Sequence, residues 1–234
     1  MSSSERSAVP DYSVVIPVHN EEGSLETLFE ELQNELRALG RPYEIIFVDD
    51  CSSDASPKLL ARFRQRDPSV KIVTLSPRSG QTFAMKQGFA AAKGEFVITL
   101  DADLQNDPAD IPKLLDKMQE GYDVVCGWRK ARQDRPLKMV LSKLGNLLQR
   151  RFTGMDIHDV SCTLRVYRRK CLPDIALDWE GQHRFIPVVL SRRGYKVGEI
   201  VSHHRKRRFD TSKYGHDRIL RVVADFFRVI SSQA

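Results

Sequence analysis

The stretch EFVITLDADLQNDPADIPKL, residues 95–114, joins a short apolar run to a loop rich in carboxylates and then to the start of a helix. EFVITL has the length and composition of a buried β-strand. Asp107 and Pro108 have the order of a helix N-cap followed by proline at the first helical position. A strand, a polar loop and a helix in this order indicate one unit of an α/β sheet, in which ligands bind beyond the carboxyl ends of the strands.

The same alternation runs through the whole first half of the chain. Four further runs have strand composition: SVVIPV (13–18), EIIFVD (44–49), VKIVTL (70–75) and DVVCGW (123–128). Between the first two, apolar residues recur at helical spacing from Leu25 to Leu39, and Gly40 follows where a helix should end. Further helix boundaries are expected at Ser56-Pro57, Gly94 and Gly121. The pattern predicts an α/β fold with a mostly parallel central sheet and helices on both faces.

Length and composition limit the class of protein. A chain of 234 residues that is 41% hydrophobic suffices for one large α/β domain, alone or with a C-terminal appendage, and this excludes a disordered tail protein. The mean hydropathy is −0.39, and no apolar run approaches the roughly 20 residues of a bilayer span, so we expect a chain that does not itself cross a membrane. MSSSERSAVP lacks the apolar segment of a secretory signal. Four cysteines without a C-x-x-C pair favour reduced thiols in a cytosolic compartment.

The charge divides the chain into two halves. Residues 1–128 hold 13 basic and 21 acidic residues, net −8, which leaves 24 and 10, net +14, for residues 129–234. An acidic half can hold a cation, whereas a basic half attracts the phosphates of nucleic acid, of a lipid surface or of a small substrate. The alternative is that the basic residues only keep the second half soluble. The large difference in net charge between the two halves argues against this alternative.

Polar clusters follow four of the expected strands. They are His19 to Glu22, Asp49 to Asp54, Arg78 to Gln81 and Asp101 to Gln105. Because parallel strands end at one edge of a sheet, these clusters describe a single site. Neither G-x-G-x-x-G nor a G-K-[ST] motif is present, so phosphate must be held in another way.

Asp101 and Asp103 are the candidate metal ligands. They lie two residues apart where EFVITL ends, so their side chains point to the same side if the backbone stays extended. Two carboxylates with a nearby oxygen donor, Gln105, suit Mg²⁺ or Mn²⁺, which also bind substrate phosphates. The alternative is a pair of turn carboxylates with no ligand.

Several segments together resemble glycosyltransferase family 2. VVIPVHNEE, FVDDCSSD, RSGQTFAMKQGFAAAKGE and VITLDADLQNDPADIPKL are similar to its nucleotide-binding GT-A core with a D-x-D metal motif. SCTLRVYRR, HRFIPVVLSRRGYKVGEI and HHRKRRFDTSKYG resemble the branch that includes dolichyl-phosphate mannosyltransferase and bacterial polyprenyl-phosphate glycosyltransferases. The resemblance implies a flexible N-terminus (1–12), a GT-A domain (13–216) and a basic amphipathic C-terminal helix (217–234). Within the domain it implies a nucleotide- and metal-binding half (13–128) and an acceptor-binding half (129–216).

The resemblance also implies site residues. The nucleotide-binding set is Pro17, Asn20, Glu21, Asp49, Gln81 and Asp101. The metal-binding set is Asp101, Asp103 and Gln105, with Mg²⁺ or Mn²⁺ as the cofactor. His19 stands where relatives usually carry an aromatic residue and Cys51 where glycine is common, which leaves the donor open between a GDP-sugar and a UDP-sugar.

Asp159 is the implied catalytic residue on the acceptor side. A sugar hydroxyl needs a base to remove its proton, whereas a phosphate monoester, with a second pKa of about 6, does not. Asp159 would therefore deprotonate a hydroxyl acceptor but only orient a phosphate acceptor. The alternative is a structural ion pair with Arg165 or Arg168. Four residues of a nearby segment either shape the sugar site or are packing or surface residues. They are Trp179, Glu180, His183 and Arg184.

Two further features point to phosphate and to a membrane. Arg205 to Arg208 precede Lys213, in a place where the related family has a mobile loop that closes over substrate, so Arg208 and Lys213 are expected catalytic residues. A solvated basic loop is the alternative. Apolar stripes flanked by basic residues lie within 137–148 and 219–230, as in helices that bind the headgroup layer or that pack on a domain.

These observations predict an inverting, metal-dependent glycosyltransferase that moves a sugar from a nucleotide-sugar to a polyprenyl (dolichyl or undecaprenyl) phosphate. The enzyme would be cytoplasmic and peripheral at the cytoplasmic face of an anionic membrane, with a homo-oligomer or a separate membrane-anchoring partner left open. The first alternative is a family 2 enzyme acting on a saccharide or other hydroxyl. A basic nucleic-acid-binding module is a further alternative, but it shows no recognised motif and leaves the acidic clusters unexplained.

We expect the protein to sediment with anionic vesicles at low salt and to detach partly as salt rises. Charge attraction is screened within about 8 Å at physiological ionic strength, whereas apolar burial is not. Deleting residues 217–234 should weaken binding to anionic and neutral vesicles alike, provided that the shortened chain still melts cooperatively. Full-length protein that stays in the supernatant at low salt would contradict the membrane prediction and favour a saccharide acceptor.

Overall fold

The computed structural model describes residues 9–130, 157–175, 177–206, 225 and 228. The expected flexible N-terminus lies largely outside these residues, as do both amphipathic stripes, Arg208 and Lys213. Within the described part of the chain, no helix is long and apolar enough to cross a membrane.

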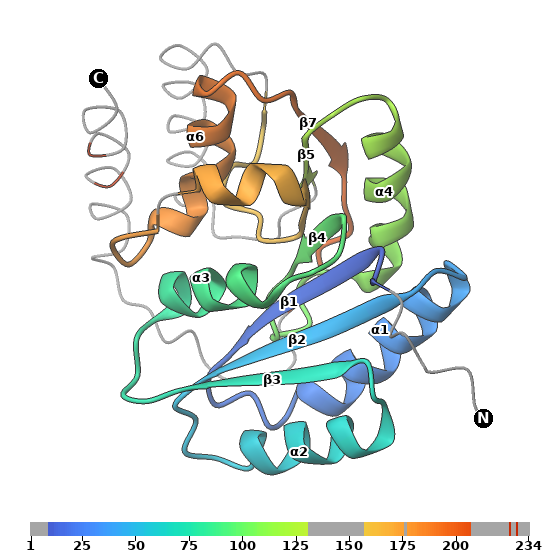
Figure 1. Ribbon diagram of the computed structural model, residues 1–234, viewed down its shortest axis with the longest axis vertical. Helices are drawn as coiled ribbons and strands as arrows, with labels where there is room; N and C mark the ends of the chain where they lie inside the picture. The colour runs from blue at the N-terminus through green and yellow to red at the C-terminus, as the bar shows by residue number, and fades with distance from the viewer. Residues whose placement is uncertain (1–8, 131–156, 176, 207–224, 226–227, 229–234) are drawn as a thin grey trace, which may run out of the picture.

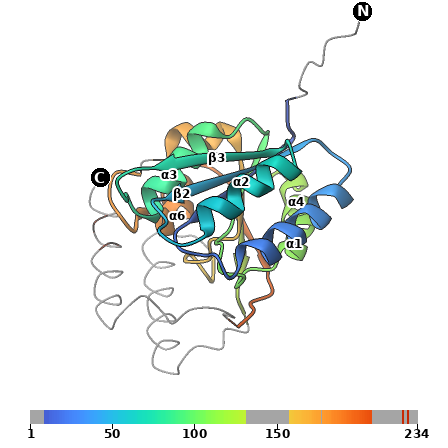
Figure 2. The ribbon, with the colours of Figure 1, turned by 90° about the horizontal axis from the view of Figure 1, so that it is seen from below.

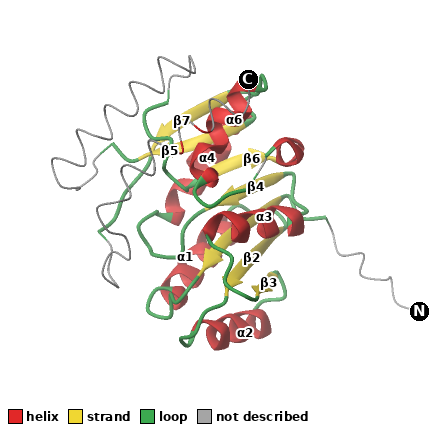
Figure 3. Ribbon diagram, turned by 90° about the vertical axis from the view of Figure 1, so that its left-hand side faces the viewer, coloured by secondary structure: helices red, strands yellow, loops and turns green. Residues whose placement is uncertain are grey.

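A seven-stranded sheet forms the centre of the described structure (Figures 1 and 3). Its spatial order is β3-β2-β1-β4-β6-β5-β7, with β3 and β7 at the two edges. The strands are β1 (Tyr12–Val18), β2 (Tyr43–Asp50), β3 (Val70–Leu75), β4 (Phe96–Thr99), β5 (Val124–Trp128), β6 (Arg165–Arg168) and β7 (Val197–Val201). Only β6 runs antiparallel to its neighbours among these strands. The five strands expected in the first half and the mostly parallel α/β sheet are confirmed.

Helices cover both faces of the sheet (Figure 2). The α-helices are α1 (Leu25–Ala38), α2 (Ser56–Arg66), α3 (Gln81–Ala91), α4 (Ile111–Gln119) and α6 (Ile186–Arg192). Short 3₁₀ turns are η1 (Pro108–Asp110), η2 (Arg169–Asp174) and η3 (Gln182–Phe185). α1, α2 and α4 pack on one face, and α3 and α6 pack on the other.

Strand β1 shows why the sheet is buried on both sides. Val14, Val15 and Ile16 are all fully buried, with Val14 and Ile16 in the core under α1 and Val15 in the core under α3. Alternate side chains of a strand point to opposite faces, so a continuous apolar run is what a two-sided core requires. Phe29 of α1 stacks on Phe63 of α2 with ring centroids 4.2 Å apart and joins the two helices on their shared face.

The expected helix boundaries are mostly confirmed, with one correction. Gly40 (φ +63°) and Gly121 (φ +88°) follow the ends of α1 and α4 in the left-handed conformation that glycine favours. Asp107 caps η1, because its side chain accepts a hydrogen bond from Ala109 N. Ser56 is not the N-cap of α2. It is the first helical residue, and its N–H donates to Asp54 Oδ1 at 2.9 Å.

The glycines near α3 serve close packing. α3 ends at Ala91, and Gly94 lies beyond the helix end, where a Cβ would stand 2.7 Å from Ser13 N. Within α3, a Cβ on Gly88 would lie 2.2 Å from Val15 Cγ1 and 3.2 Å from Val48 Cγ2. The helix therefore approaches the sheet so closely that it leaves no room for a side chain at Gly88.

We expect Gly88→Ala to destabilise the protein by about 1–3 kcal/mol, because overpacking against Val15 forces the helix away from the sheet. Helix propensity alone favours the opposite sign, since alanine in a helix is better than glycine by about 0.5–1 kcal/mol. Gln87→Ala, on the exposed side of α3, is the control and should be nearly neutral. Urea unfolding measures both variants, and a stabilised Gly88→Ala would contradict the close-packing account.

Candidate active site

The loops after β1 and β2 hold each other through reciprocal hydrogen bonds. Asn20 N donates to Ser52 Oγ at 3.0 Å, and Asn20 Oδ1 accepts from Ser53 N at 2.7 Å. Glu22 Oε2 accepts from Ala55 N at 2.7 Å. Asn20 has a φ of +54°, a conformation that asparagine tolerates better than most residues. The two polar clusters expected at neighbouring strand ends are therefore one braced rim at the carboxyl edge of the sheet.

The other expected nucleotide-binding residues of this region lie on the same rim. Pro17 lies near the end of β1, paired in register with Val48. Glu21 N donates to Ser56 Oγ at 3.0 Å, which explains why Ser56 turns away from a capping role. Asp49, almost fully buried, accepts from Ser52 N at 3.1 Å. Sequence reasoning had placed all of these at one edge, and the structure brings them together there.

Asp50 is a residue of this rim that the sequence did not single out. Its two carboxylate oxygens accept hydrogen bonds from Ser79 N at 2.6 Å and from Gly80 N at 2.9 Å. Asp50 thereby fixes the loop after β3 and the start of α3 against β2. The second carboxylate of the Asp49-Asp50 pair was the only sequence signal for this role.

Asp101 is bound on both carboxylate oxygens. Oδ1 accepts from Gln81 Nε2 at 2.7 Å, and Oδ2 accepts from Thr163 Oγ1 at 2.7 Å. Burial, followed by the negative charge of Asp103, raises the pKa of Asp101 above its ordinary value. β4 ends at Thr99, and the chain then turns, so the extended backbone assumed for Asp101 and Asp103 is not present. Their charges nonetheless lie close enough to repel each other.

These side chains fit a divalent cation that is shared with a substrate. Asp103 is nearly buried, and its carboxylate accepts from Gln105 N at 3.1 Å. The Gln105 amide nitrogen lies 3.5 Å from His204 Nε2. In the described part of the chain, no group of three His, Cys, Asp or Glu side chains forms a closed metal site. Mg²⁺ commonly uses one or two carboxylates together with substrate phosphates, and a cation beside Asp101 and Asp103 would offset their repulsion.

Asp159 is held by an arginine that the sequence reasoning missed. Arg129 Nε donates to Asp159 Oδ2 at 2.7 Å, and Arg129 Nη2 donates to Oδ1 at 2.9 Å. Ser161 Oγ donates to the same carboxylate at 3.0 Å. The expected alternative partners were wrong, because Arg165 binds backbone carbonyls and Arg168 pairs with Glu95. The sequence signal for Arg129 was its place directly after a strand, at the start of the basic half.

Arg129 also acts on the candidate metal site. Burial opposes its charge, but the hydrogen bonds and charge of Asp159, with a contribution from Asp101, hold the pKa of Arg129 above its ordinary value. In turn, the charge of Arg129 partly offsets the rise in the pKa of Asp101 that burial and Asp103 cause. The Arg129 guanidinium therefore binds the acceptor-side carboxylate, and its positive charge also acts on Asp101 of the D-x-D motif.

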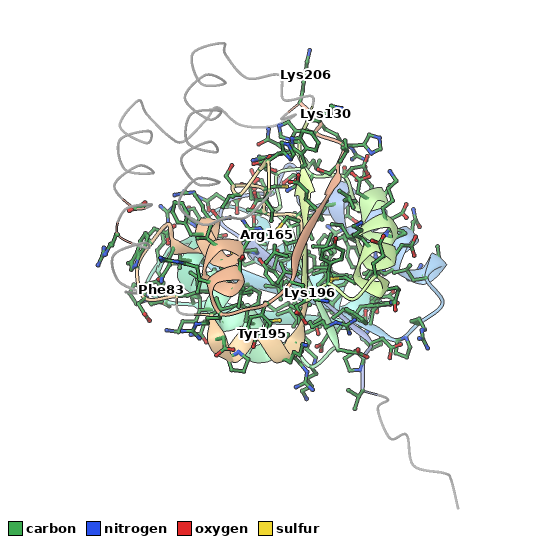
Figure 4. The ribbon with its side chains drawn as sticks, turned by 90° about the horizontal axis from the view of Figure 1, so that it is seen from above. Phe83, Lys130, Arg165, Tyr195, Lys196 and Lys206 are labelled. Atoms are coloured by element: carbon green, nitrogen blue, oxygen red, sulfur yellow. The ribbon has the colours of Figure 1, made fainter. Side chains whose placement is uncertain are left out.

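The start of the basic run is fixed to the acidic half. Arg205 Nη1 donates to Glu31 Oε2 at 2.7 Å, and Arg205 Nη2 lies 2.7 Å from Asp107 Oδ1. His203 N donates to the buried carboxylate of Asp110 at 2.6 Å. Arg205 is thus occupied by two carboxylates and is not a candidate for binding phosphate. Lys130 and Lys206, both exposed, project from the same end of the molecule (Figure 4).

The 179–184 segment lies at the amino end of α3. Glu180 Oε2 accepts from Thr82 N at 3.0 Å. Thr82 Oγ1 accepts from Gly181 N at 2.8 Å and lies 2.7 Å from His183 Nδ1. His183 is almost fully buried, which agrees with the alternative that this segment packs in the core. Glu180 instead bonds to Thr82, the neighbour of Gln81, and Gln81 binds Asp101.

The sheet order, the braced polar rim and the acidic pair at the end of β4 define a nucleotide-sugar-binding fold of the GT-A type. The sequence profile "Glycosyl transferase family 2" matches residues 13–175. The chain belongs to this family, and it is a glycosyltransferase.

Two curated relatives and one solved structure are similar to this chain over most of its length. An undecaprenyl-phosphate 4-deoxy-4-formamido-L-arabinose transferase of Yersinia enterocolitica serotype O:8 is 38% identical over 233 residues, covering 99% of this chain and 70% of that protein. The transferase of the same name from Pectobacterium carotovorum subsp. carotovorum is 40% identical over 226 residues, covering 96% and 68%. Glucosyl-3-phosphoglycerate synthase from Mycobacterium tuberculosis, solved with Mg²⁺ and UDP, superposes with a TM-score of 0.74 at 18% identity over 96% of this chain and 80% of that chain.

We expect Asp103→Asn to lower turnover by about 10²-fold or more while leaving the fold intact, because its charge serves a cation rather than the core. Asp116→Asn, which changes an exposed carboxylate on α4, is the matched control and should retain activity. Melting temperature and nucleotide-sugar turnover are measured for both. Activity of Asp103→Asn within severalfold of the unmodified protein would remove Asp103 from the metal site.

Proposed function

We propose that this glycosyltransferase transfers one sugar, with inversion at the anomeric carbon, from a nucleotide-sugar to a polyprenyl phosphate. The relatives named as undecaprenyl-phosphate transferases support this acceptor. The observation that carries the proposal is the ion pair between Arg129 and Asp159, because Asp159 lies four residues before Thr163, which donates a hydrogen bond to Asp101. The Arg129 guanidinium, with 13% of its side chain exposed, supplies a permanent positive charge on the acceptor side, which suits an anionic phosphate acceptor.

The donor side of the proposal uses the braced rim. Pro17, Asn20, Glu21, Asp49, Gln81 and Asp101 are the proposed nucleotide-binding residues. Mg²⁺ or Mn²⁺, held by Asp101 and Asp103 with Gln105 nearby, would supply positive charge to the diphosphate as it leaves. A GDP-sugar and a UDP-sugar are both compatible with the residues of the rim. The acidic charge of residues 1–128 is consistent with this division of the domain into a donor half (13–128) and an acceptor half (129–216).

The acceptor side needs no general base. At neutral pH a phosphate monoester is largely dianionic, so one of its oxygens attacks the anomeric carbon directly while the bond to the nucleoside diphosphate breaks. Arg129 would balance the acceptor charge, and Asp159 would orient Arg129. Arg208 and Lys213, outside the described residues, remain proposed catalytic residues that bind phosphate. We further propose that the reaction takes place at the cytoplasmic membrane face, with the enzyme attached peripherally.

A saccharide or other hydroxyl acceptor is the second candidate function, and it would require Asp159 as the base. Asp159 accepts two hydrogen bonds from the Arg129 guanidinium, one from Arg129 N and one from Ser161. Both carboxylate oxygens are therefore occupied by donors of the protein itself, whereas a general base must accept the proton of the acceptor hydroxyl. The geometry therefore favours the phosphate acceptor.

The test compares undecaprenyl phosphate, undecaprenol and a saccharide as acceptors, with UDP- and GDP-sugars and Mn²⁺. Product should form with the phosphate only. Arg129→Gln should lower kcat/KM by about 10²-fold, and Asp159→Asn by about 10-fold or less with an unchanged pH profile, because no proton passes to Asp159. Arg168→Gln is the control for Arg129→Gln and should retain activity, because Arg168 pairs with the start of β4, at the end of the sheet away from the site.

Two results would contradict the proposal. One is transfer to undecaprenol or a saccharide in preference to the phosphate. The other is a loss of about 10²–10⁴-fold in Asp159→Asn together with the loss of the basic limb of the pH profile, which would mark Asp159 as a general base.

A further inference from the structure

Arg165 is a buried arginine that neither the donor site nor the acceptor site uses directly. It lies on β6 with 1% of its surface exposed, in the interior of the molecule (Figure 4). Its Nη2 donates to Val160 O at 2.6 Å and to Arg184 O at 3.1 Å, and its Nη1 donates to His183 O at 2.9 Å. In the described structure its guanidinium hydrogen-bonds to no carboxylate.

Packing alone does not explain an arginine at this position. Burying a charge among neutral groups is costly, and an apolar side chain of similar volume would fill the space without that cost. Arg165 Nε even lacks a hydrogen-bond partner in the described structure. What arginine offers is a rigid, planar set of donors that can hold several carbonyl oxygens at once.

The three carbonyls belong to the two segments that flank the site. Val160 follows Asp159, in a stretch (157–164) that has no helix or strand of its own. His183 and Arg184 lie in η3, where the ring of His183 contacts Thr82 at the start of α3. The Arg165 guanidinium is therefore a hydrogen-bonded link between the acceptor-side loop and the donor-side helix end, in addition to the bond from Thr163 to Asp101.

A continuous path of contacts crosses the site through this link. From Arg165 it passes through His183 to Thr82, whose neighbour Gln81 binds Asp101. In the other direction it passes through Val160 to Asp159, which binds Arg129. A shift of either segment would move one reacting group relative to the other.

We propose that Arg165 is a positioning residue that sets the distance between the acceptor-side pair, Arg129 and Asp159, and the D-x-D motif. The part that concerns Asp159 rests on the proposed acceptor site. Arg165 touches neither reactant and acts through the backbone of the two segments.

The test replaces Arg165 with methionine, which is unbranched and apolar, and with lysine, which keeps the charge but not the planar set of donors. In Arg165→Met we expect kcat to fall by about 30-fold or more and the acceptor KM to rise, since a misplacement of about 1 Å costs roughly 10²-fold in rate. The Kd for the nucleoside diphosphate with Mn²⁺, measured by calorimetry, should rise by less than the acceptor KM, because Arg165 reaches Gln81 and Asp101 only through His183 and Thr82, whereas the rim after β1 and β2 does not depend on it. Arg165→Lys should recover part of kcat.

Arg168→Met is the matched control. Arg168 lies on the same strand and also donates to backbone carbonyls, those of Tyr122 and Met118. It lies at the other end of the strand, beside the start of β4 and away from the site. The Arg168→Met variant should have a lower melting temperature and an unchanged kcat. All rates are compared at temperatures where each variant is fully folded by circular dichroism, so that a loss of stability is not read as a loss of positioning.

A double variant tests the path itself. If Arg165 acts through the Asp159 loop, Arg165→Met combined with Asp159→Asn should be within about 3-fold of Arg165→Met alone. Independent, multiplying effects would overturn the proposal, as would a folded Arg165→Met with kcat and acceptor KM within about 2-fold of the unmodified protein. If the unmodified protein uses a saccharide rather than a polyprenyl phosphate, the proposed function fails separately, and the same comparison is made with that saccharide.

Discussion

The two hydrogen bonds to Asp101 join parts of the chain that are far apart in sequence. Gln81 reaches it from the first turn of α3, and Thr163 reaches it from the segment that leads into β6. Because Asp101 is buried beside Asp103, its charge must be compensated locally, and the groups that do so come from both halves of the molecule. The start of α3, the segment before β6 and Arg129 each contribute to this compensation.

The structure shows where individual charges of the basic half are placed. The basic half does not simply surround the acidic half with counter-charge. Its first arginine, Arg129, is held by Asp159 at the site, whereas Arg205 is held by Glu31 and Asp107, away from any free phosphate position. Two arginines of one basic half thus have different partners: Arg129 pairs with the proposed acceptor-side carboxylate, and Arg205 fixes the chain after β7 to the loop of the D-x-D motif.

The braced rim and the Arg165 link divide the work of positioning. Backbone-directed hydrogen bonds brace the β1 and β2 loops against each other, and all of these bonds come from the first half of the chain. On the acceptor side, the 157–164 stretch is held at Asp159 by Arg129 and at Thr163 by Asp101, and the buried Arg165 guanidinium adds a bond to Val160 O between them. Transfer between two substrates depends on the relation of the two sides, which is where a rigid planar donor is most effective.

The sequence by itself determined the strands of the first half, the helix from Leu25 to Ala38 and the edge at which Asp49, Asp101 and Asp103 would meet. These features follow from the period of apolar residues and from the rule that parallel strands end together, both of which are local or topological. Only the tertiary structure decided that Asp159 pairs with Arg129 rather than with Arg165 or Arg168, that Asp50 braces α3, and that Ser56 bonds to Glu21 instead of capping its helix. Such choices depend on which side chains the folded sheet brings within about 3 Å, and sequence spacing carries no information on that distance for residues far apart in the chain.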